Sequence, residues 1–403
     1  MTNTVLTHQM LAREAAAMLS EEMNFLSNIN RGREEEFKEA ANGYKKGDFV
    51  DIGIPPVPTV FDGSNFAGGG AAPDSNEQKV RLQLATQKHV PLTFTAKEKA
   101  LSVTDFKTRF LKPAINSLGS VVQADLIQRA VVATPNIVGT AGTLPNTFKI
   151  YGQARSVLER FLAPEGDRTV LVSSDASNEL ADAIKNQQNP SDTLNKAFMQ
   201  GYITKAQSLD MYENQSLPIF ANGSATGFTI SGAGQTGATL NIASLTAAQT
   251  ILKGTVFSIP NVYAVHPVLG VSNGKLRQFV LTADFTASGT TGTISIYPAI
   301  AATTASVVGT VSALPANGQA VTLFGAASTG YRQHLAFHKN AFAAAFAPLP
   351  ILASCVGYTA TVGGFSVRVM TFGNGQTDTE STRIDVLYGF AAVRPDHASR
   401  ITE

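Results

Sequence analysis

The stretch from Ala221 to Gly330 is almost uncharged, and this most limits what the chain can fold into. Its charged residues are Lys253, Lys275, Arg277 and Asp284. The rest is rich in Gly, Ser, Thr, Ala and Val, with short apolar runs between turn residues. These runs predict strands at 227–231, 239–242, 255–259, 278–281, 293–297 and 319–324. Short strands in such a series predict an all-β barrel or sandwich.

Residues on both sides of this stretch have a mixed pattern. Between Thr147 and Pro218 we expect helix 151–162, strand 168–173, helix 176–185, and a short helix and connection over 195–202 and 206–212. Two alternating runs, 365–372 and 382–393, predict a closing hairpin around a turn at Gly373. A β module between two such segments is best explained as an insertion.

The N-terminal third predicts an arm-like organisation. Apolar residues recur near helical spacing from His8 to about Asn42. Prolines then make residues 52–60 extended. A glycine-rich tip, 61–74, precedes two alternating runs, 81–86 and 90–95. Strand, flexible tip and strand together predict a long β-arm.

A long helix is expected next. Ser102 to Asp105 has the spacing of a capping box, and apolar residues recur every fourth position from Phe106 to Ala130. Pro113 should kink this helix or divide it into two. Further on, the apolar run 335–345 predicts another helix.

The segment between Lys339 and Arg368 carries no charge, but Pro348 and Pro350 interrupt it. A membrane-spanning helix needs about 20 predominantly apolar residues, so we expect a buried core segment and no membrane. Cys355 is the only cysteine, which excludes an intrachain disulfide or a CxxC site. No basic segment with an apolar core begins the chain, so we expect folding in a reducing cytoplasm.

Composition also bounds the function. Charged residues make up only 15% of the 403 residues, which suits a surface largely buried against other copies of the chain. The formal net charge of +1 argues against a dedicated nucleic-acid binder, because phosphate binding needs clustered Lys and Arg.

Several short patterns resemble catalytic or metal motifs. His334 and His338 have the i, i+4 spacing of zinc ligands on a helix, but the Glu of HExxH and a third ligand are missing. Gly270 to Lys275 resembles a phosphate loop that is one residue short, with Leu276 in place of Ser or Thr. We therefore expect ordinary helix residues in the first case and a hairpin turn in the second.

A nucleophile elbow is also matched in letters, since Gly270 to Gly274 fits GxSxG around Ser272. Asp284 and His334 follow in the hydrolase order. The elbow requires a strand-to-helix turn, whereas a strand pattern follows here, so we expect a β-turn.

The remaining motif-like residues have plainer explanations. The glycines 68–70 lack the flanking strand and helix of a dinucleotide site. Cys355 lies among uncharged residues, which predicts an inert thiol. Asn214 and Asn222 match a glycosylation sequon that has no meaning without secretion. We expect no catalytic, cofactor-binding or metal-binding residue.

The order of these segments resembles the major capsid fold of tailed phages and herpesviruses. More narrowly, it is similar to coat proteins of short-tailed Salmonella-type phages that carry a telokin-like β-barrel insertion. The residues behind the resemblance are 90–98 leading into 101–106, then 217–233, 335–349 and 387–396.

The resemblance implies an α+β fold and a shell-building role without enzymatic activity. It divides the chain into an N-terminal arm (1–48), an extended β-arm (49–102), a spine helix with peripheral domain (103–148), an axial domain in two parts (149–220 and 331–364), an inserted β-barrel domain (221–330) and closing strands (365–403). It further implies hexamers and pentamers of the chain in an icosahedral capsid, assembled in the bacterial host cytoplasm. The implied partners are a scaffolding protein, a portal protein and, in some relatives, a decoration protein. The shell would enclose double-stranded DNA without binding it specifically.

One departure concerns the insertion. Its best-known relatives carry a long charged loop that contacts a neighbouring capsomer, whereas residues 234–239 are short and uncharged here. Two other hypotheses remain open from the residues alone. They are a bacterial surface or adhesin-like β protein, which would require export, and an enzyme with an accessory β-barrel, which would require a convergent polar site.

Overall fold

The computed structural model describes residues 8–32, 49–55, 64, 78–95, 112–184, 205–303, 308–374, 376 and 379–403. The chain divides into two compact units, and each is treated by itself. One unit comprises Met1–Ile52, Lys79–Ile127 and Phe342–Val393. The other comprises Gly53–Gln78, Gln128–Ala341 and Arg394–Glu403. Helix α5 (Lys112–Ala133) contributes residues to both.

The first unit is built on a five-stranded antiparallel sheet. Strands β18 (Phe342–Ala347), β21 (Thr379–Ala392), β20 (Phe365–Asn374) and β19 (Val356–Val362) follow one another in that order, and β3 (Thr86–Thr95) also pairs with β21. The β20–β21 pair confirms the predicted closing hairpin. Strand β1 (Phe49–Ile54) pairs with β2 (Gln78–Gln83), as the arm pattern predicts, while most of the tip between them lies outside the described residues.

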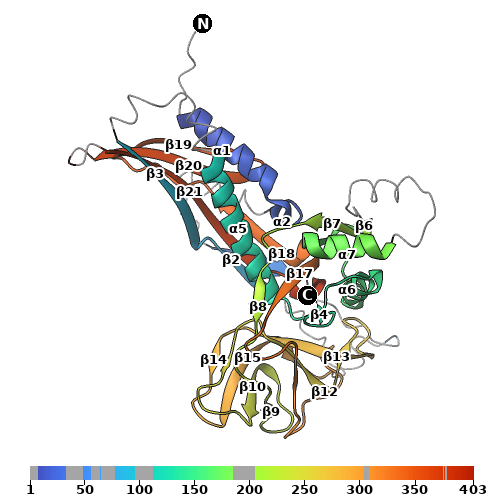
Figure 1. Ribbon diagram of the computed structural model, residues 1–403. Helices are drawn as coiled ribbons and strands as arrows, with labels where there is room; N and C mark the ends of the chain where they lie inside the picture. The colour runs from blue at the N-terminus through green and yellow to red at the C-terminus, as the bar shows by residue number, and fades with distance from the viewer. Residues whose placement is uncertain are drawn as a thin grey trace. The chain divides into compact units, whose positions relative to one another are not determined.

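Helices cover one face of this sheet (Figure 1). His8 of α1 (His8–Glu22) lies 2.9 Å from the Thr371 hydroxyl of β20, and the Tyr388 hydroxyl of β21 donates to Asp125 of α5 at 2.7 Å. The short helix α2 (Asn24–Ser27) follows a break at Met23. Pro113 is the second residue of α5 as described, and the expected capping box lies outside the described residues.

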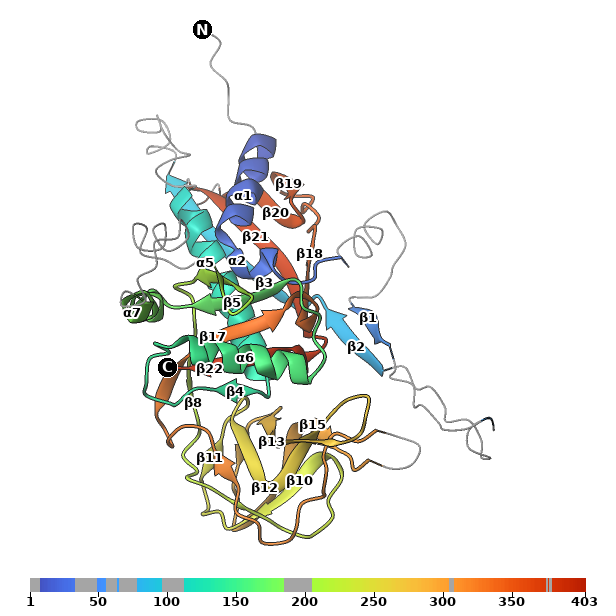
Figure 2. The same ribbon diagram turned by 90° about the vertical axis from the view of Figure 1, so that its right-hand side faces the viewer.

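The second unit contains a seven-stranded mixed sheet. Its order is β4 (Ile137–Val138), β22 (Ala398–Thr402), β17 (Gly330–His338), β5 (Arg168–Val172), β7 (Leu209–Glu213) and β6 (Lys205–Ala206), with β8 (Ile219–Ala221) also paired to β17. Helix α6 (Phe148–Arg160) packs on this sheet through Tyr151, Ala154 and Leu158 (Figure 2). Together with α7 (Ser174–Ile184), these elements confirm the predicted helix, strand and helix.

Two expectations are wrong here. Residues 335–345 do not form a helix, because they belong to β17, a 3₁₀ turn (Lys339–Ala341) and β18. A short apolar run buried on both faces of a sheet has no periodicity that separates it from a buried helix. Residues 206–212, expected as a connection, lie in the hairpin β6–β7, whose tight turn has positive φ at Gln207 and Ser208. The short helix expected over 195–202 lies outside the described residues.

The uncharged stretch forms a closed β-barrel. Its sheet runs β16 (Thr322–Leu323), β12 (Val256–Val265), β13 (Ser272–Leu281), β15 (Thr291–Ile300), β10 (Gly237–Ala243) and β9 (Thr229–Ile230). The backbone of 318–321 then bonds to that of 228–230, which joins the two ends of the sheet. All six predicted strands are present. Of the two architectures that the sequence left open, barrel and sandwich, the structure has the barrel.

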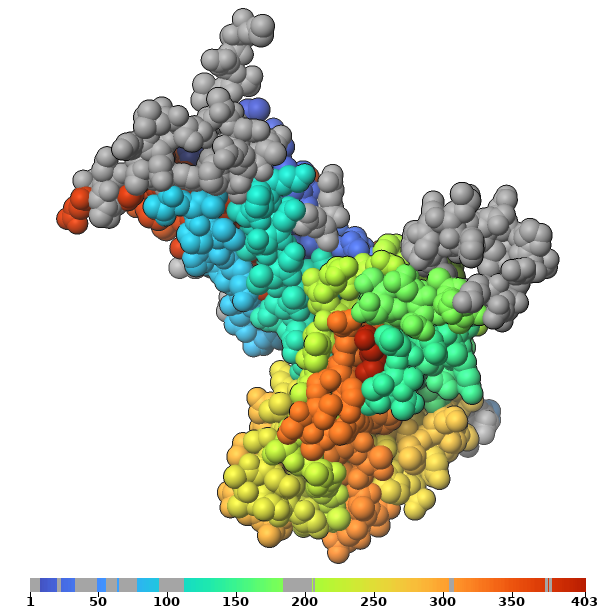
Figure 3. All heavy atoms as spheres, viewed as in Figure 1, coloured from blue at the N-terminus to red at the C-terminus, as the bar shows by residue number. Residues whose placement is uncertain are grey.

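A single apolar core fills the barrel. Phe257 stacks on Phe279 with ring centroids 5.6 Å apart, and Phe228 meets Phe257 edge-on at 5.4 Å. The short strands β11 (Thr250–Ile251) and β14 (Phe285–Thr286) form a separate pair beside this core. Residues 222–303 and 308–330 form one continuous mass, coloured yellow to orange, on the face shown in Figure 3.

Candidate functional site

The three residues of the apparent nucleophile motif do not meet. The Ser272 hydroxyl accepts from the Gly274 amide at 3.2 Å, and Asp284 accepts from the Lys253 amide at 2.6 Å. His334 lies on β17, in the seven-stranded sheet. Gly270 and Gly274 both have φ of +68°, and strand β13 follows rather than a helix. The segment is therefore a hairpin turn and neither a nucleophile elbow nor a phosphate loop.

The two histidines lie on a strand, so their predicted placement on a helix is wrong. His334 is fully buried, where Nδ1 accepts from the Ser173 amide at 3.2 Å and Nε2 donates to Glu403 at 3.2 Å. This hydrogen bond from His334, ahead of the nearby Arg332 charge, lowers the pKa of Glu403. His338 instead faces His397, with ring centroids 6.2 Å apart. In the described part of the chain, no group of three His, Cys, Asp or Glu side chains is placed to hold a metal ion.

The contacts of the other motif-like residues that the structure describes are structural ones. Asn214 accepts from the Ser216 amide at 2.7 Å, and Asn222 donates to the carbonyls of Phe324 and Gly325. Both asparagines are buried. Cys355 is a free thiol in the turn before β19. The glycines 68–70 lie outside the described residues.

A polar site in the second unit joins the barrel to the seven-stranded sheet. Arg277 of β13 donates to Asp396 at 2.7 Å, and the Tyr297 hydroxyl of β15 donates to the same carboxylate at 3.4 Å. Burial, followed by the Asp396 charge, raises the pKa of Tyr297. Beside this pair, Gln278 exchanges two hydrogen bonds of 2.9 Å with the backbone of Ile137.

Arg400 of β22 makes a second connection between the barrel and the seven-stranded sheet. Its side chain is fully buried, and its described partners include no carboxylate. Its guanidinium donates to the Thr134 carbonyl at 2.9 and 2.7 Å and to the Gly254 carbonyl at 2.8 Å. Thr134 follows the C-terminal end of α5, where carbonyl dipoles favour a cation. Burial lowers the pKa of Arg400 to about 9, so the group stays charged near neutrality.

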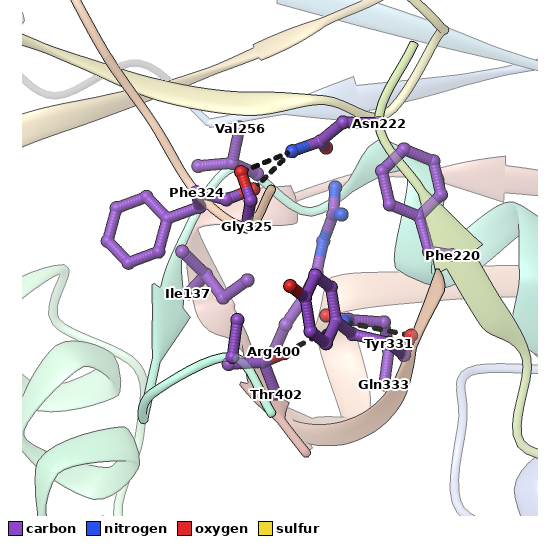
Figure 4. Close-up of a pocket in the computed structure, with 11 residues that line it drawn as sticks. Ile137, Phe220, Asn222, Val256, Phe324, Gly325, Tyr331, Gln333, Arg400 and Thr402 are labelled. Atoms are coloured by element: carbon purple, nitrogen blue, oxygen red, sulfur yellow. Dashed lines mark hydrogen bonds between the residues drawn. The ribbon is translucent and has the colours of Figure 1, made fainter. Parts of the chain in front are cut away.

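A cavity of about 20 Å³ lies beside Arg400 (Figure 4). Gln333 lines it and donates through Nε2 to the Tyr331 carbonyl and the Thr402 hydroxyl. Its buried Oε1 has no hydrogen-bond partner within the described residues. This volume has room for about one water molecule, so the site can connect segments but cannot hold a substrate or cofactor.

Sequence reasoning missed the roles of Asp396 and Arg400, and it found Arg277 only as a charged residue of the barrel. Arg277 directly precedes the uncharged end of its strand, residues 278–281, which was a signal that it needs a buried partner. No signal identified that partner, because Asp396 lies 119 residues further along the chain.

His397, next to this site, makes stability depend on pH. Burial first, then the charges of Arg394 and His338, lower the pKa of His397 to about 4, although Asp396 and the Phe161 carbonyl act in the opposite direction. Between about pH 6.5 and about pH 4 the unfolded chain binds a proton that the folded chain does not. We therefore expect the free energy of unfolding to fall by up to about 3 kcal/mol across this window.

Urea unfolding at about pH 7 and about pH 5 measures this loss. The variant His397→Gln should flatten the pH dependence, because it removes the titrating group. The exposed His89→Gln should leave the dependence as in the wild type. An undiminished slope in His397→Gln would contradict the assignment, because it would locate the proton uptake elsewhere.

A family model identifies the family of this chain. The family model described as "P22 coat protein - gene protein 5" matches residues 68–400. No curated protein matches the chain in sequence. Within the described residues, no helix is long and apolar enough to cross a membrane.

The chain is also similar to solved structures from phages. A chain from Mycobacterium phage Che8 is similar at 13% identity with a TM-score of 0.51, over 94% of this chain and 90% of that one. The capsid of Cyanophage P-SCSP1u gives 11% identity and a TM-score of 0.46 over 89% and 84% of the two chains. The mature capsid of bacteriophage PhiM1 gives 9% and 0.43 over 89% and 82%.

The family match covers most of the chain, and the polar site of the second unit only connects segments of the fold. Nothing among these matches supports the adhesin hypothesis. The chain belongs to the P22 coat protein family, and it is a major capsid protein that forms a phage shell and is not an enzyme.

Proposed function

We propose that the chain assembles as hexamers and pentamers into an icosahedral shell around a scaffolding protein, with a portal protein at one vertex. The match of residues 68–400 to the coat protein family carries this proposal. Assembly takes place in the bacterial host cytoplasm, and the finished shell encloses double-stranded DNA as a wall. A decoration protein is a further candidate partner for the outer surface.

We also propose the division into arms, peripheral and axial domains and an inserted barrel that the resemblance implies. The pairing of β8 with β17 supports the insertion, because Ala221 faces Gly330 across two antiparallel strands. The chain thus leaves and re-enters the seven-stranded sheet at one place. Residues 49–102 would be the arm that reaches a neighbouring subunit, and 103–134 the spine helix.

The short loop of the barrel is poorly suited to contact a neighbouring capsomer. Gln235 donates to the carbonyls of Ser231, Gly232 and Asn241, and its own oxygen accepts from the Asn241 amide at 2.7 Å. These bonds close residues 231–241 on themselves. The loop neither extends far nor carries charge, so a different part of the barrel should supply any contact between capsomers.

Electron microscopy of the protein, purified alone and co-expressed with its scaffolding protein, tests the assembly. We expect uniform closed shells, with scaffold improving their number and regularity. A folded monomer that never assembles under either condition would contradict the proposal. Labelled scaffold that does not sediment with the shells would contradict the scaffold partnership alone.

A further inference from the structure

Asparagine is followed by glycine at positions 42, 222, 273, 317 and 374 of this chain. Such a pair can lose ammonia, because glycine has no side chain to shield the backbone nitrogen that attacks the asparagine side chain. In a folded protein the reaction requires that this nitrogen and the side chain are not held by hydrogen bonds. The structure describes both residues of the pairs at Asn222, Asn273 and Asn317, and it restrains them differently.

The pair at Asn222 is enclosed. Asn222 is buried, and its Nδ2 donates to the carbonyls of Phe324 and Gly325. A Cβ on Gly223 would lie 2.0 Å from the carbonyl oxygen of Thr250, so the backbone of Gly223 has no free space on this side. Ring closure would have to break both hydrogen bonds and open this packing.

The attacking nitrogen of the pair at Asn317 already has a partner. The Gly318 amide donates to the Ile230 carbonyl at 2.8 Å, in the contact that closes the barrel. The Asn317 side-chain oxygen accepts from the Gly232 amide at 2.7 Å, which holds the side chain in place. This pair can therefore react only after both bonds have opened.

The pair at Asn273 lacks these restraints. Gly274 lies in an irregularity of the β12–β13 pairing, and its amide donates only at 3.2 Å, to the hydroxyl of the exposed Ser272. No atom lies within 4 Å of the place where a Cβ of Gly274 would be. Within the described residues the buried Nδ2 of Asn273 has no hydrogen-bond partner. Keeping such a group buried costs free energy, and its departure removes that cost.

We propose that Asn273 is a deamidation site of the folded protein and that it reacts ahead of Asn222 and Asn317. The Gly274 nitrogen bonds to Cγ of Asn273, the Cγ–Nδ2 bond breaks, and ammonia leaves with the proton that Gly274 gives up. Solvent water then adds to one of the two carbonyls of the ring, which yields aspartate or isoaspartate.

The reaction changes the charge of the barrel surface with time. Residues 256–281 contain no Asp or Glu, so the product is the first acidic side chain on this hairpin, and it lies close to Lys275. Each conversion also lowers the formal net charge of the chain, which begins at +1, by one unit. The inference goes beyond shell assembly, because it applies to the free subunit as well.

Peptide mapping by mass spectrometry tests the order of reaction. Trypsin places the three pairs on separate peptides, 206–253, 254–275 and 278–332. After incubation of the folded protein in a mildly alkaline buffer, Asn273 should carry the mass gain of an amide converted to an acid. An amide hydrogen bond that must first open slows a reaction by about tenfold, so Asn222 and Asn317 should lag by about this factor or more.

The same incubation in urea is the control, because unfolding removes the restraints and all three asparagines should then convert at similar rates. Asn273→Gln should abolish the gain in its peptide, since glutamine forms its larger ring slowly. The matched variant Asn317→Gln should leave the conversion of Asn273 unchanged. The proposal would be overturned if Asn222 or Asn317 reacted as fast as Asn273 in the folded protein. It would also be overturned if Asn273 stayed intact in the folded protein while the unfolded chain reacted.

Discussion

Replacing Arg400 with methionine should lower the free energy of unfolding by on the order of 3–5 kcal/mol. Methionine fills most of the space but donates no hydrogen bond, so the buried carbonyls of Thr134 and Gly254 lose their guanidinium donors. Each buried carbonyl left without a partner costs about 1–3 kcal/mol. The end of α5 also loses the cation beside its carbonyl dipoles.

Urea unfolding at neutral pH measures this effect. Arg155→Met is a matched control, since Arg155 makes an exposed pair with Glu159 at 2.7 Å, and its loss should cost less than about 1 kcal/mol. Arg400→Lys should fall between the two, because one ammonium group cannot reach both carbonyls with the planar geometry of a guanidinium. If Arg400→Met unfolded like the control, the guanidinium would not hold these segments together.

Replacing Asp385 with alanine should lower the free energy of unfolding of the first unit by about as much. The carboxylate is fully buried and accepts from Arg368 at 3.2 and 2.8 Å, from Arg383 at 2.7 Å and from Gln87 at 3.1 Å. Its removal leaves Arg368 charged and nearly buried without a counterion. Removing one partner of such a buried pair lowers the free energy of unfolding by about 3–5 kcal/mol.

A double-mutant cycle separates this mechanism from simple loss of packing. Arg368→Met should rescue much of the stability lost in Asp385→Ala, because the uncompensated charge disappears. Asp51→Ala, which breaks the exposed pair with Arg81, should cost less than about 1 kcal/mol. Strictly additive losses for Asp385→Ala and Arg368→Met would show that the charge is not the cause.

Local patterns predicted local structure well. The barrel strands follow from alternation between turn residues, and the β20–β21 hairpin from two such runs around Gly373. Where the partner lies far away in sequence, the same reasoning failed. Residues 335–345 are apolar enough for a helix, yet β17 is buried between β22 and β5, which only the assembled sheet can reveal.

The contacts of Arg400 could not be predicted from the sequence for the same reason. The partners of Arg400 lie 266 and 146 residues away, so no spacing in the sequence relates them. The resemblance to capsid proteins supplied the family.

The register between β8 and β17 makes the barrel exchangeable by gene fusion. Residues paired across antiparallel strands lie about 5 Å apart, so any foreign domain whose ends are equally close could be spliced between Ala221 and Gly330. Such a chimera would leave Asp396 and Arg400 without their barrel partners. A working exchange should therefore replace Asp396 with an uncharged residue but keep Arg400, which still donates to the Thr134 carbonyl, so that the shell protein can carry an unrelated cargo domain on the same strands.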